Sequence, residues 1–283
     1  MYGPSIICRT LSESSISDKH GNSWQYYSRS DLHTKVACWS VLFDVLLHSP
    51  MLRRHAERNS VCFALNREMQ DFWTGDRKTV DLALGAPGED VAAQKAVSLK
   101  GLKDSYGIRL DPREEDLFEF LPDISASPVR NVQLAVDART CMTGHAAALG
   151  RLQKDLCADH ATIHGAADAA IAVSLIMVNA ADEFVSPDRN KVRAEGQAPI
   201  VSRHKQPRDA SRVCDCVCAL PRRMDLDDVG YDALGVIALD GRNDGSPFSL
   251  VPPDAAPAVD DPFHYEAMVK SIAEAYEARF PAV

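Results

Sequence analysis

Short apolar stretches separated by turn-forming residues predict the strands of a sheet. The five stretches that fit a strand are residues 61–65, 79–84, 131–139, 170–178 and 234–239. The fourth is a nearly continuous apolar run, which is typical of a central strand covered on both faces. Between the first two, Phe72 to Asp76 predict the turn of a hairpin, because Gly75 can take positive φ there.

Apolar residues at helical spacing predict helices around these strands. One helix is expected over residues 30–48, ending before Pro50. Another follows the strand at 131–139, and Thr140 or Thr143 would cap it. The remaining helical segments are residues 209–220, residues 264–280 and a mainly helical, acidic insertion at 89–128.

The order of these elements predicts an α/β protein with a mixed central sheet that helices flank. Residues 1–27 are rich in serine and turn formers, so we expect a loose N-terminal arm or a peripheral element there. Residues 28–250 would form the main domain. Residues 251–283 begin with a linker rich in Pro, Ala and Asp and end in a helix that we expect to pack on the same domain.

The net charge of the chain limits the ways in which it could bind nucleic acid. The net charge of −9 argues against a protein that coats nucleic acid without specificity, but it is compatible with a local basic groove. Residues 189–212 carry seven basic and two acidic side chains, a local charge of +5. This segment could follow a nucleic-acid backbone or could be a solvated loop. The candidate phosphate contacts are Lys78, Arg189, Lys191, Arg203 and Lys205.

Cysteine usage and the N-terminal sequence predict a cytoplasmic protein. The eight cysteines have scattered spacing, and residues 1–8 lack the basic region and apolar run of a secretion signal. We therefore expect reduced thiols, as in the cytosol. No apolar stretch approaches the ~18 residues that a membrane-spanning helix needs.

Two of the predicted strands place a carboxylate among apolar neighbours. These carboxylates belong to Asp81 and Asp137, and Arg139 follows the second by two positions. Carboxylates so placed are costly unless they hold a metal ion or a charged partner. The pattern therefore predicts either a metal-dependent hydrolytic site or two strand ends at which Arg139 pairs with an acid.

The order helix, strand, turn, strand with Asp81, strand with Asp137 and Arg139, helix resembles the core of the PD-(D/E)XK nucleases, the restriction-endonuclease-like superfamily. The likeness covers roughly residues 30–180. Two segments also look like parts of bacterial restriction-type nucleases, residues 71–75 and 177–180. In this pattern Asp81 takes the first acid position, Asp137 the second and Arg139 the position of the family's lysine. The resemblance implies a restriction-endonuclease-like core with a helical insertion and a C-terminal extension.

The resemblance also implies a chemistry and a partner. Asp81 and Asp137 would ligate Mg²⁺, or Mn²⁺ in its place, and Glu68 or Asp44 would be a third acid. The metal would activate a water and stabilise charge on the phosphate, while Arg139 would hold a nonbridging oxygen. The implied function is endonucleolytic cleavage of DNA, in restriction or defence, with RNA left open as a substrate and a homodimer left open as the assembly.

The residue at position 139 supports a competing hypothesis. Arginine stays protonated, so Arg139 cannot act as a general base in place of lysine. The chain would then be a catalytically lapsed nuclease-fold protein that binds nucleic acid or a protein partner.

Two further motifs allow a third hypothesis, a thiol or zinc protein. Cys157, His160 and His164 have a spacing that zinc sites use, but the lack of a fourth ligand nearby in sequence favours incidental residues at a helix end. The Cys-x-Cys-x-Cys motif at 214–218 is read by default as small buried apolar residues.

Overall fold

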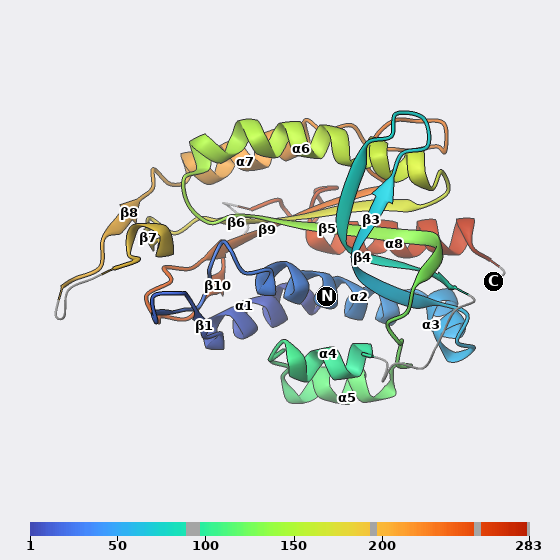
Figure 1. Ribbon diagram of the computed structural model, residues 1–283, viewed down its shortest axis with the longest axis horizontal. Coiled ribbons are helices and arrows are strands. Elements are labelled where there is room, and N and C mark those ends of the chain that lie inside the picture. The colour runs from blue at the N-terminus through green and yellow to red at the C-terminus, as the bar shows by residue number, and fades with distance from the viewer. Residues whose placement is uncertain (89–96, 193–196, 252–255, 282–283) are drawn as a thin grey trace.

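The computed structural model describes residues 1–88, 97–192, 197–251 and 256–281. Its centre is a six-stranded mixed sheet with the order β10-β9-β6-β5-β4-β3 (Figure 1). These strands are β3 (Cys62–Gln70), β4 (Arg77–Pro87), β5 (Val129–Cys141), β6 (Ile171–Asn179), β9 (Ala233–Asp240) and β10 (Ser249–Leu250). β3, β4 and β5 form an antiparallel meander, β6 and β9 run parallel to β5, and β10 is antiparallel to β9. Helices cover both faces, so the predicted mixed α/β architecture is confirmed.

β6 lies in the middle of the sheet, as its apolar sequence predicts. All nine of its residues are buried, and it pairs with β5 on one side and β9 on the other. At one edge of the sheet, the β3–β4 hairpin extends away toward solvent and closes in the predicted turn, with Gly75 at φ +76°.

Each face of the sheet carries its own helical layer and its own apolar core. One layer consists of α1 (Gly3–Glu13), α2 (Leu32–His48), α3 (Pro50–Glu57) and α8 (Tyr265–Arg279). The opposite layer consists of α6 (His145–Ala166) and α7 (Arg208–Cys218). Outside α2 lie α4 (Leu99–Ser105) and α5 (Pro112–Phe120), where Phe118 packs against Trp39 and Phe43. The described part of the predicted insertion is therefore helical, as expected.

The N-terminal segment is not the loose arm that the composition of residues 1–27 predicts. α1 packs on α2, and its buried apolar residues include Ile6, Ile7 and Leu11. The buried Asp44 carboxylate of α2 accepts hydrogen bonds from the backbone N–H groups of Tyr2 (3.0 Å) and Gly3 (2.7 Å). The expectation is wrong for α1 because a serine-rich composition hides an apolar face at helical spacing. The Asp44 carboxylate binds the N–H groups at the start of α1, so it is not a third acid beside Asp81.

Small elements complete the chain. β1 (Ile16–Ser17) and β2 (Ser23–Trp24) form a short hairpin, while β7 (Glu183–Val185), the turn η1 (Pro187–Arg189) and β8 (Val201–Arg203) protrude at one end of the molecule (Figure 1). α8 packs on β9 and α2, as expected for the C-terminal helix, and residues 252–255 of the predicted linker lie outside the described residues. In the described ranges, no single helix is long and apolar enough to cross a membrane. By length and composition alone, α2 and α3 taken together would be sufficient, and the chain bends by 101° between them.

Candidate functional site

The strands β4 and β5 part at Asp81. Their pairing runs from Pro87 opposite Val129 to Leu82 opposite Val136, and beyond this point β4 pairs with β3 alone. The backbone N–H of Ala138 therefore has no β4 carbonyl opposite it, and it donates to Asp81 Oδ2 instead (2.9 Å). The Asp81 carboxylate thus lies against the peptide that joins Asp137 to Ala138, at the point where the sheet opens.

Asp137 is buried on β5 and binds two cations. Its Oδ2 atom accepts hydrogen bonds from Lys78 Nζ (3.2 Å) and Arg139 Nε (2.9 Å). Side chains two residues apart on a strand share a face, so Asp137 and Arg139 both point toward α6. Lys78 reaches the same place from β4, because this part of β4 crosses α6 after leaving β5.

α6 completes this group with two carboxylates one helical turn apart. Arg139 forms ion pairs with Asp155 (3.4 Å) and with Asp159. Lys78 Nζ also lies 3.0 Å from Asp159 Oδ2. We call these five residues the Asp137 cluster: Lys78, Asp137, Arg139, Asp155 and Asp159.

The pKa shifts in the cluster follow from burial and charge. Burial raises the pKa of Asp137, and the negative charge of Asp81 adds to this, while Arg139 and Lys78 oppose it. Burial alone would lower the pKa of Arg139, but the Asp137 and Asp159 carboxylates outweigh burial and raise it. Arg139 therefore stays charged and can hold an anion, but it cannot accept a proton.

Asp81 faces a different cation. Lys35 on α2 is buried, and its Nζ atom lies 4.0 Å from Asp81 Oδ1 and contacts the side chain of Asn66. Asp81 therefore has its cation on the α2 side, whereas Asp137 has its cations on the α6 side. In the described part of the chain, Oδ1 of each of these two carboxylates accepts no hydrogen bond. Within the same residues, no group of three or more His, Cys, Asp or Glu side chains is placed to hold a metal ion.

A pocket of about 190 Å³ opens beside Arg139. Its walls come from the end of β5, from α6 and from Thr34 at the start of α2. Its charged lining residues are Arg139, the exposed Arg151 and Asp155. A small anionic group in this pocket would meet the guanidinium groups of Arg139 and Arg151 and the carboxylate of Asp155.

Other predicted site residues lie elsewhere. Glu68 is exposed on the hairpin and pairs with Arg77 (3.3 Å), so it is not part of the Asp137 cluster. In the basic segment, Lys191 lies 3.4 Å from Asp188 and Arg203 lies 3.5 Å from Glu183. The remaining predicted contacts, Arg189 and Lys205, are exposed on the same protrusion, and residue 193 lies outside the described residues. Their role in binding phosphates remains a prediction.

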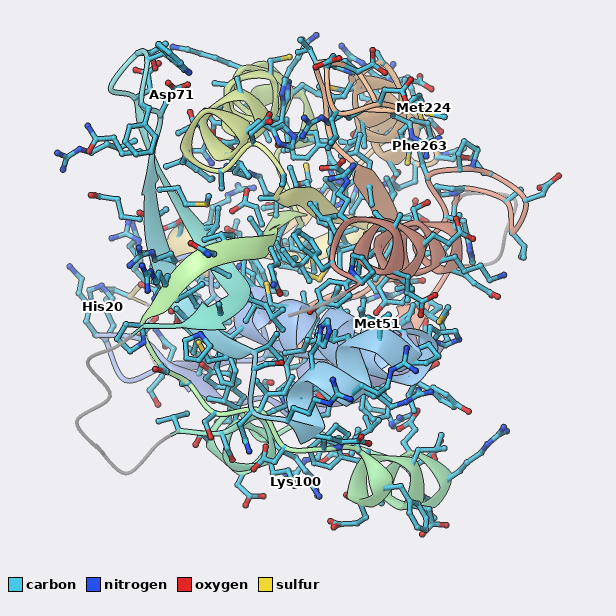
Figure 2. The ribbon with its side chains drawn as sticks, turned by 90° about the vertical axis from the view of Figure 1, so that its right-hand side faces the viewer. His20, Met51, Asp71, Lys100, Met224 and Phe263 are labelled. Carbon is cyan, nitrogen blue, oxygen red and sulfur yellow. The ribbon has the colours of Figure 1, made fainter. Side chains whose placement is uncertain are left out.

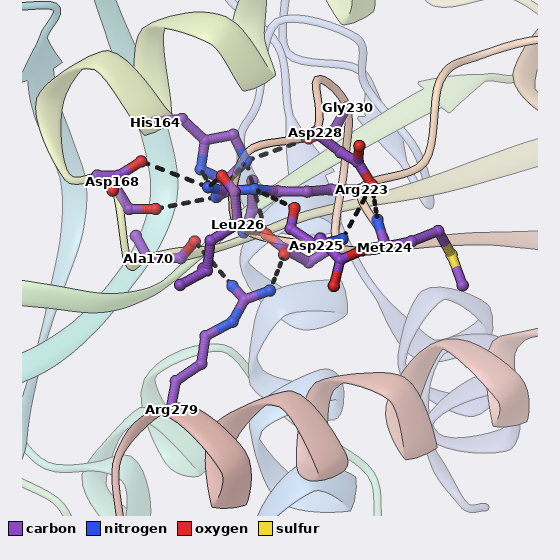
Figure 3. A network of polar contacts seen from close by, with 12 residues as sticks. His164, Asp168, Ala170, Arg223, Met224, Asp225, Leu226, Asp228, Gly230 and Arg279 are labelled. Atoms are coloured by element: carbon purple, nitrogen blue, oxygen red, sulfur yellow. Dashed lines mark hydrogen bonds and ion pairs between the residues drawn. The ribbon is translucent and has the colours of Figure 1, made fainter.

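The Cys157, His160 and His164 motif lies on α6, but its members have separate neighbours. Cys157 is exposed, and His160 packs edge-to-face on Tyr231. Figure 3 shows His164 against Arg223, whose guanidinium donates to His164 Nδ1 (2.7 Å). His164 Nε2 in turn donates to the Gly230 carbonyl (3.1 Å). This network fixes the loop between α7 and β9.

The cysteines of α7 are free thiols. Burial raises the pKa of Cys214 to about 11, so without a metal ion this group is a protonated thiol at neutral pH.

Three members of the site were missed or misplaced by sequence reasoning. Lys78 was expected to contact phosphate from the surface, whereas it is buried between two carboxylates. Asp155 and Asp159 were not singled out. The available signal was their spacing of four residues on the helix that follows Asp137 and Arg139, which puts both carboxylates on one face.

Comparisons of this chain with protein-family models, with curated proteins and with solved structures give no match. Its function must therefore be inferred from the geometry of the site.

Proposed function

We propose that this protein is a metal-dependent nuclease that hydrolyses phosphodiester bonds of DNA at the Asp137 cluster. The observation that carries the proposal is the divergence of β4 from β5. It places the Asp81 carboxylate against the Asp137–Ala138 peptide and lets Asp137 bind Lys78 and Arg139, of which Arg139 lines an open pocket. The element order also supports it: α2, the β3–β5 meander, α6 and the parallel strand β6 follow one another as the likeness to PD-(D/E)XK nucleases implies. RNA as a substrate and a homodimeric assembly remain open predictions.

Asp81 and Asp137 would hold the metal. Their Oδ1 atoms accept no hydrogen bond within the described residues, although Asp81 Oδ1 lies 4.0 Å from Lys35 Nζ. Hard oxygen donors suit Mg²⁺ or Mn²⁺, and Mg²⁺ commonly takes one or two protein carboxylates together with waters and phosphate oxygens. When bound, the ion would supply an acidified water and neutralise charge on the phosphate. Burial favours the protonated form of Asp137, so we expect metal binding to weaken as the pH falls.

Arg139 and Arg151 would bind the phosphate. A guanidinium can hold two phosphate oxygens at once, and Arg139 is kept charged by its carboxylate partners. Asp155 and Asp159 orient the Arg139 side chain from α6. The phosphate would then approach through the pocket that Arg151 lines.

Lys78 would supply the amine group of the nuclease family's lysine, whose position Arg139 takes in this chain. Its Nζ atom lies 3.2 Å from Asp137 Oδ2, although it comes from a different strand. An ammonium group can give up a proton to a leaving oxygen, whereas a guanidinium holds its protons too tightly. In this proposal, Arg139 binds and Lys78 transfers the proton.

Cleavage of supercoiled plasmid DNA in Mg²⁺ tests the proposal. We expect wild type to nick the plasmid and Asp81→Ala, Asp137→Ala and Lys78→Met to lose this activity. Asp104→Asn, an exposed position on α4, is the matched control and should cut like wild type. Equal cutting by the two alanine variants and wild type would remove the site assignment.

A catalytically lapsed nuclease-fold protein that binds nucleic acid is the second candidate. The specific observation in its favour is that Asp137 Oδ2 already accepts hydrogen bonds from both Lys78 and Arg139, so the chain neutralises this carboxylate with its own cations. Arg139→Lys discriminates between the candidates. Cleavage by this variant alone, with none by wild type, would indicate the lapsed enzyme.

A further inference from the structure

The turn between β3 and β4 displays two aromatic rings to solvent. Phe72 is 85% exposed and Trp73 is 92% exposed, although these are among the most hydrophobic side chains in the protein. The other two tryptophans, Trp24 and Trp39, are buried. We call residues 71–76 the hairpin tip.

The hairpin tip is held in place rather than loose. Asp71 Oδ1 accepts hydrogen bonds from the backbone N–H groups of Trp73 (2.6 Å) and Thr74 (2.9 Å). The Phe72 N–H donates to the carbonyl of Gly165, near the end of α6 (3.2 Å). A Cβ atom at Gly165 would lie 2.0 Å from Asp71 Oδ2, so glycine is needed for this close approach. Figure 2 shows Asp71 at the far end of the hairpin, beside α6. The two rings are therefore presented by a fixed support.

The groove beside the two rings has a mixed lining of polar and apolar side chains. An open groove of about 1000 Å³ runs beside the tip, between the hairpin, the start of β5 and the end of α6. Phe72 lines this groove together with two arginines, three side-chain amides and two carboxylates: Arg67, Arg130, Gln70, Asn131, Gln133, Glu68 and Asp168. The other large apolar side chains of β3 and β4 are buried or half-buried. Flat, solvent-exposed rings beside the amide and guanidinium groups of this groove suit nucleobases and phosphates.

We propose that Phe72 and Trp73 stack on nucleobases of the nucleic acid bound at the Asp137 cluster. This inference rests on the proposed function. It places the part of the bound nucleic acid beyond the Asp137 cluster at the hairpin tip. Lys78 lies five positions after Trp73, which is at most about 16 Å of extended chain. This is roughly five rises of a duplex at 3.4 Å each, so the stacked base lies within about five nucleotides of the phosphate at the cluster. Arg67 and Arg77 are exposed on the same hairpin, and Arg77 pairs with Glu68 (3.3 Å).

Fluorescence anisotropy with a labelled 20-nucleotide DNA, as a single strand and as a duplex, tests the inference. EDTA is present, so that binding is measured without cleavage. Loss of one stacked base is worth about 1–3 kcal/mol, so Trp73→Ala should weaken binding roughly 5- to 150-fold. Trp73→Phe should retain most of the affinity because it keeps a flat ring. Phe120→Ala is the matched control, because Phe120 is 89% exposed on α5, away from the hairpin.

The intrinsic fluorescence of Trp73 provides a second readout. Trp73 is the exposed tryptophan, so single-stranded DNA should quench its emission and protect it from iodide. A stronger effect with the single strand than with the duplex would indicate unpaired bases as the ligand, and equal effects would indicate insertion into a duplex.

The outcomes separate this inference from the nuclease proposal. Quenching of Trp73 by DNA without cleavage in Mg²⁺ would support the stacking surface and reject the enzyme. Cleavage by a protein whose Trp73→Ala variant binds like Phe120→Ala would reject the stacking surface alone. Failure of wild type to bind either DNA, or a change in self-association rather than DNA affinity on Trp73→Ala, would also overturn the inference.

Discussion

Replacing Lys78 with methionine is the sharpest stability test of the Asp137 cluster. Methionine keeps most of the side-chain volume but removes the charge that two buried carboxylates share. The side chains of Lys78, Asp137 and Asp159 are 13%, 6% and 11% exposed, so water can replace little of the lost interaction. Removing one partner of a buried ion pair typically costs about 3–5 kcal/mol. Because Arg139 remains in contact with both acids, we expect a loss of about 3 kcal/mol, near the lower end of that range.

This loss converts to a measurable shift in melting temperature. A chain of 283 residues has an unfolding entropy of about 0.6 kcal/mol/K near its midpoint, so about 3 kcal/mol corresponds to about 5 °C. Differential scanning calorimetry of wild type and Lys78→Met measures it. Lys270→Met is the control, because Lys270 forms an exposed i,i+4 pair with Glu266 that contributes less than about 1 kcal/mol.

A double variant separates pairing from packing. If Lys78 acts through Asp137, then Asp137→Asn should cost less in the Lys78→Met background than in wild type, since the carboxylate no longer needs its cation. A Lys78→Met protein that melts within 1 °C or so of the Lys270→Met control would refute the buried ion pair.

Two further predictions concern His33 and Gly165. Burial lowers the pKa of His33 to about 4, although the Asp31 carboxylate opposes this, so the folded state takes up fewer protons than the unfolded state below pH 6.5. The stability that neutral His33 contributes is fully present above pH 6.5 and is lost as the pH falls toward 4, by about 3 kcal/mol in total. His33→Phe keeps a ring in contact with Tyr26. This variant should therefore lose that part of the pH dependence of the free energy of unfolding, measured in urea. An unchanged pH profile in His33→Phe would contradict this assignment. Gly165→Ala should push Asp71 from its turn and speed hydrogen exchange at the Trp73 and Thr74 amides, whereas unaltered exchange would show that the tip is held by other contacts.

Local sequence patterns predict most of the sheet. The apolar run of β6 indicates a central strand, and Gly75 marks the hairpin turn, because both signals depend on a few adjacent residues. Element ends are less well predicted. The cap expected at Thr140 or Thr143 is absent because β5 continues to Cys141, and Gly144 at φ +64° precedes α6.

The candidate site is only half visible in the sequence. Asp137 and Arg139 are two residues apart on one strand, so their shared face and their pairing follow from strand geometry alone. The spacing of Asp155 and Asp159 shows only that they share a face of α6. That Asp159 and Lys78 meet Arg139 and Asp137 depends on where β4 leaves β5 and on which face of α6 meets the sheet. Lys35 is a similar case, since it reaches Asp81 from a helix that precedes the sheet in the chain.

Cleavage of supercoiled plasmid by wild type and Asp137→Asn, side by side in Mg²⁺, is the most direct test of the central claim. Asparagine preserves the shape of the side chain and removes its charge, and circular dichroism confirms that the variant is folded. We predict that wild type nicks the plasmid and that the variant is slower by more than roughly 100-fold, the upper end of losses seen for residues that only orient metal ligands. Equal rates for the two proteins, or no cleavage by wild type in either Mg²⁺ or Mn²⁺, would contradict the assignment of a phosphodiester-hydrolysing site to the Asp137 cluster.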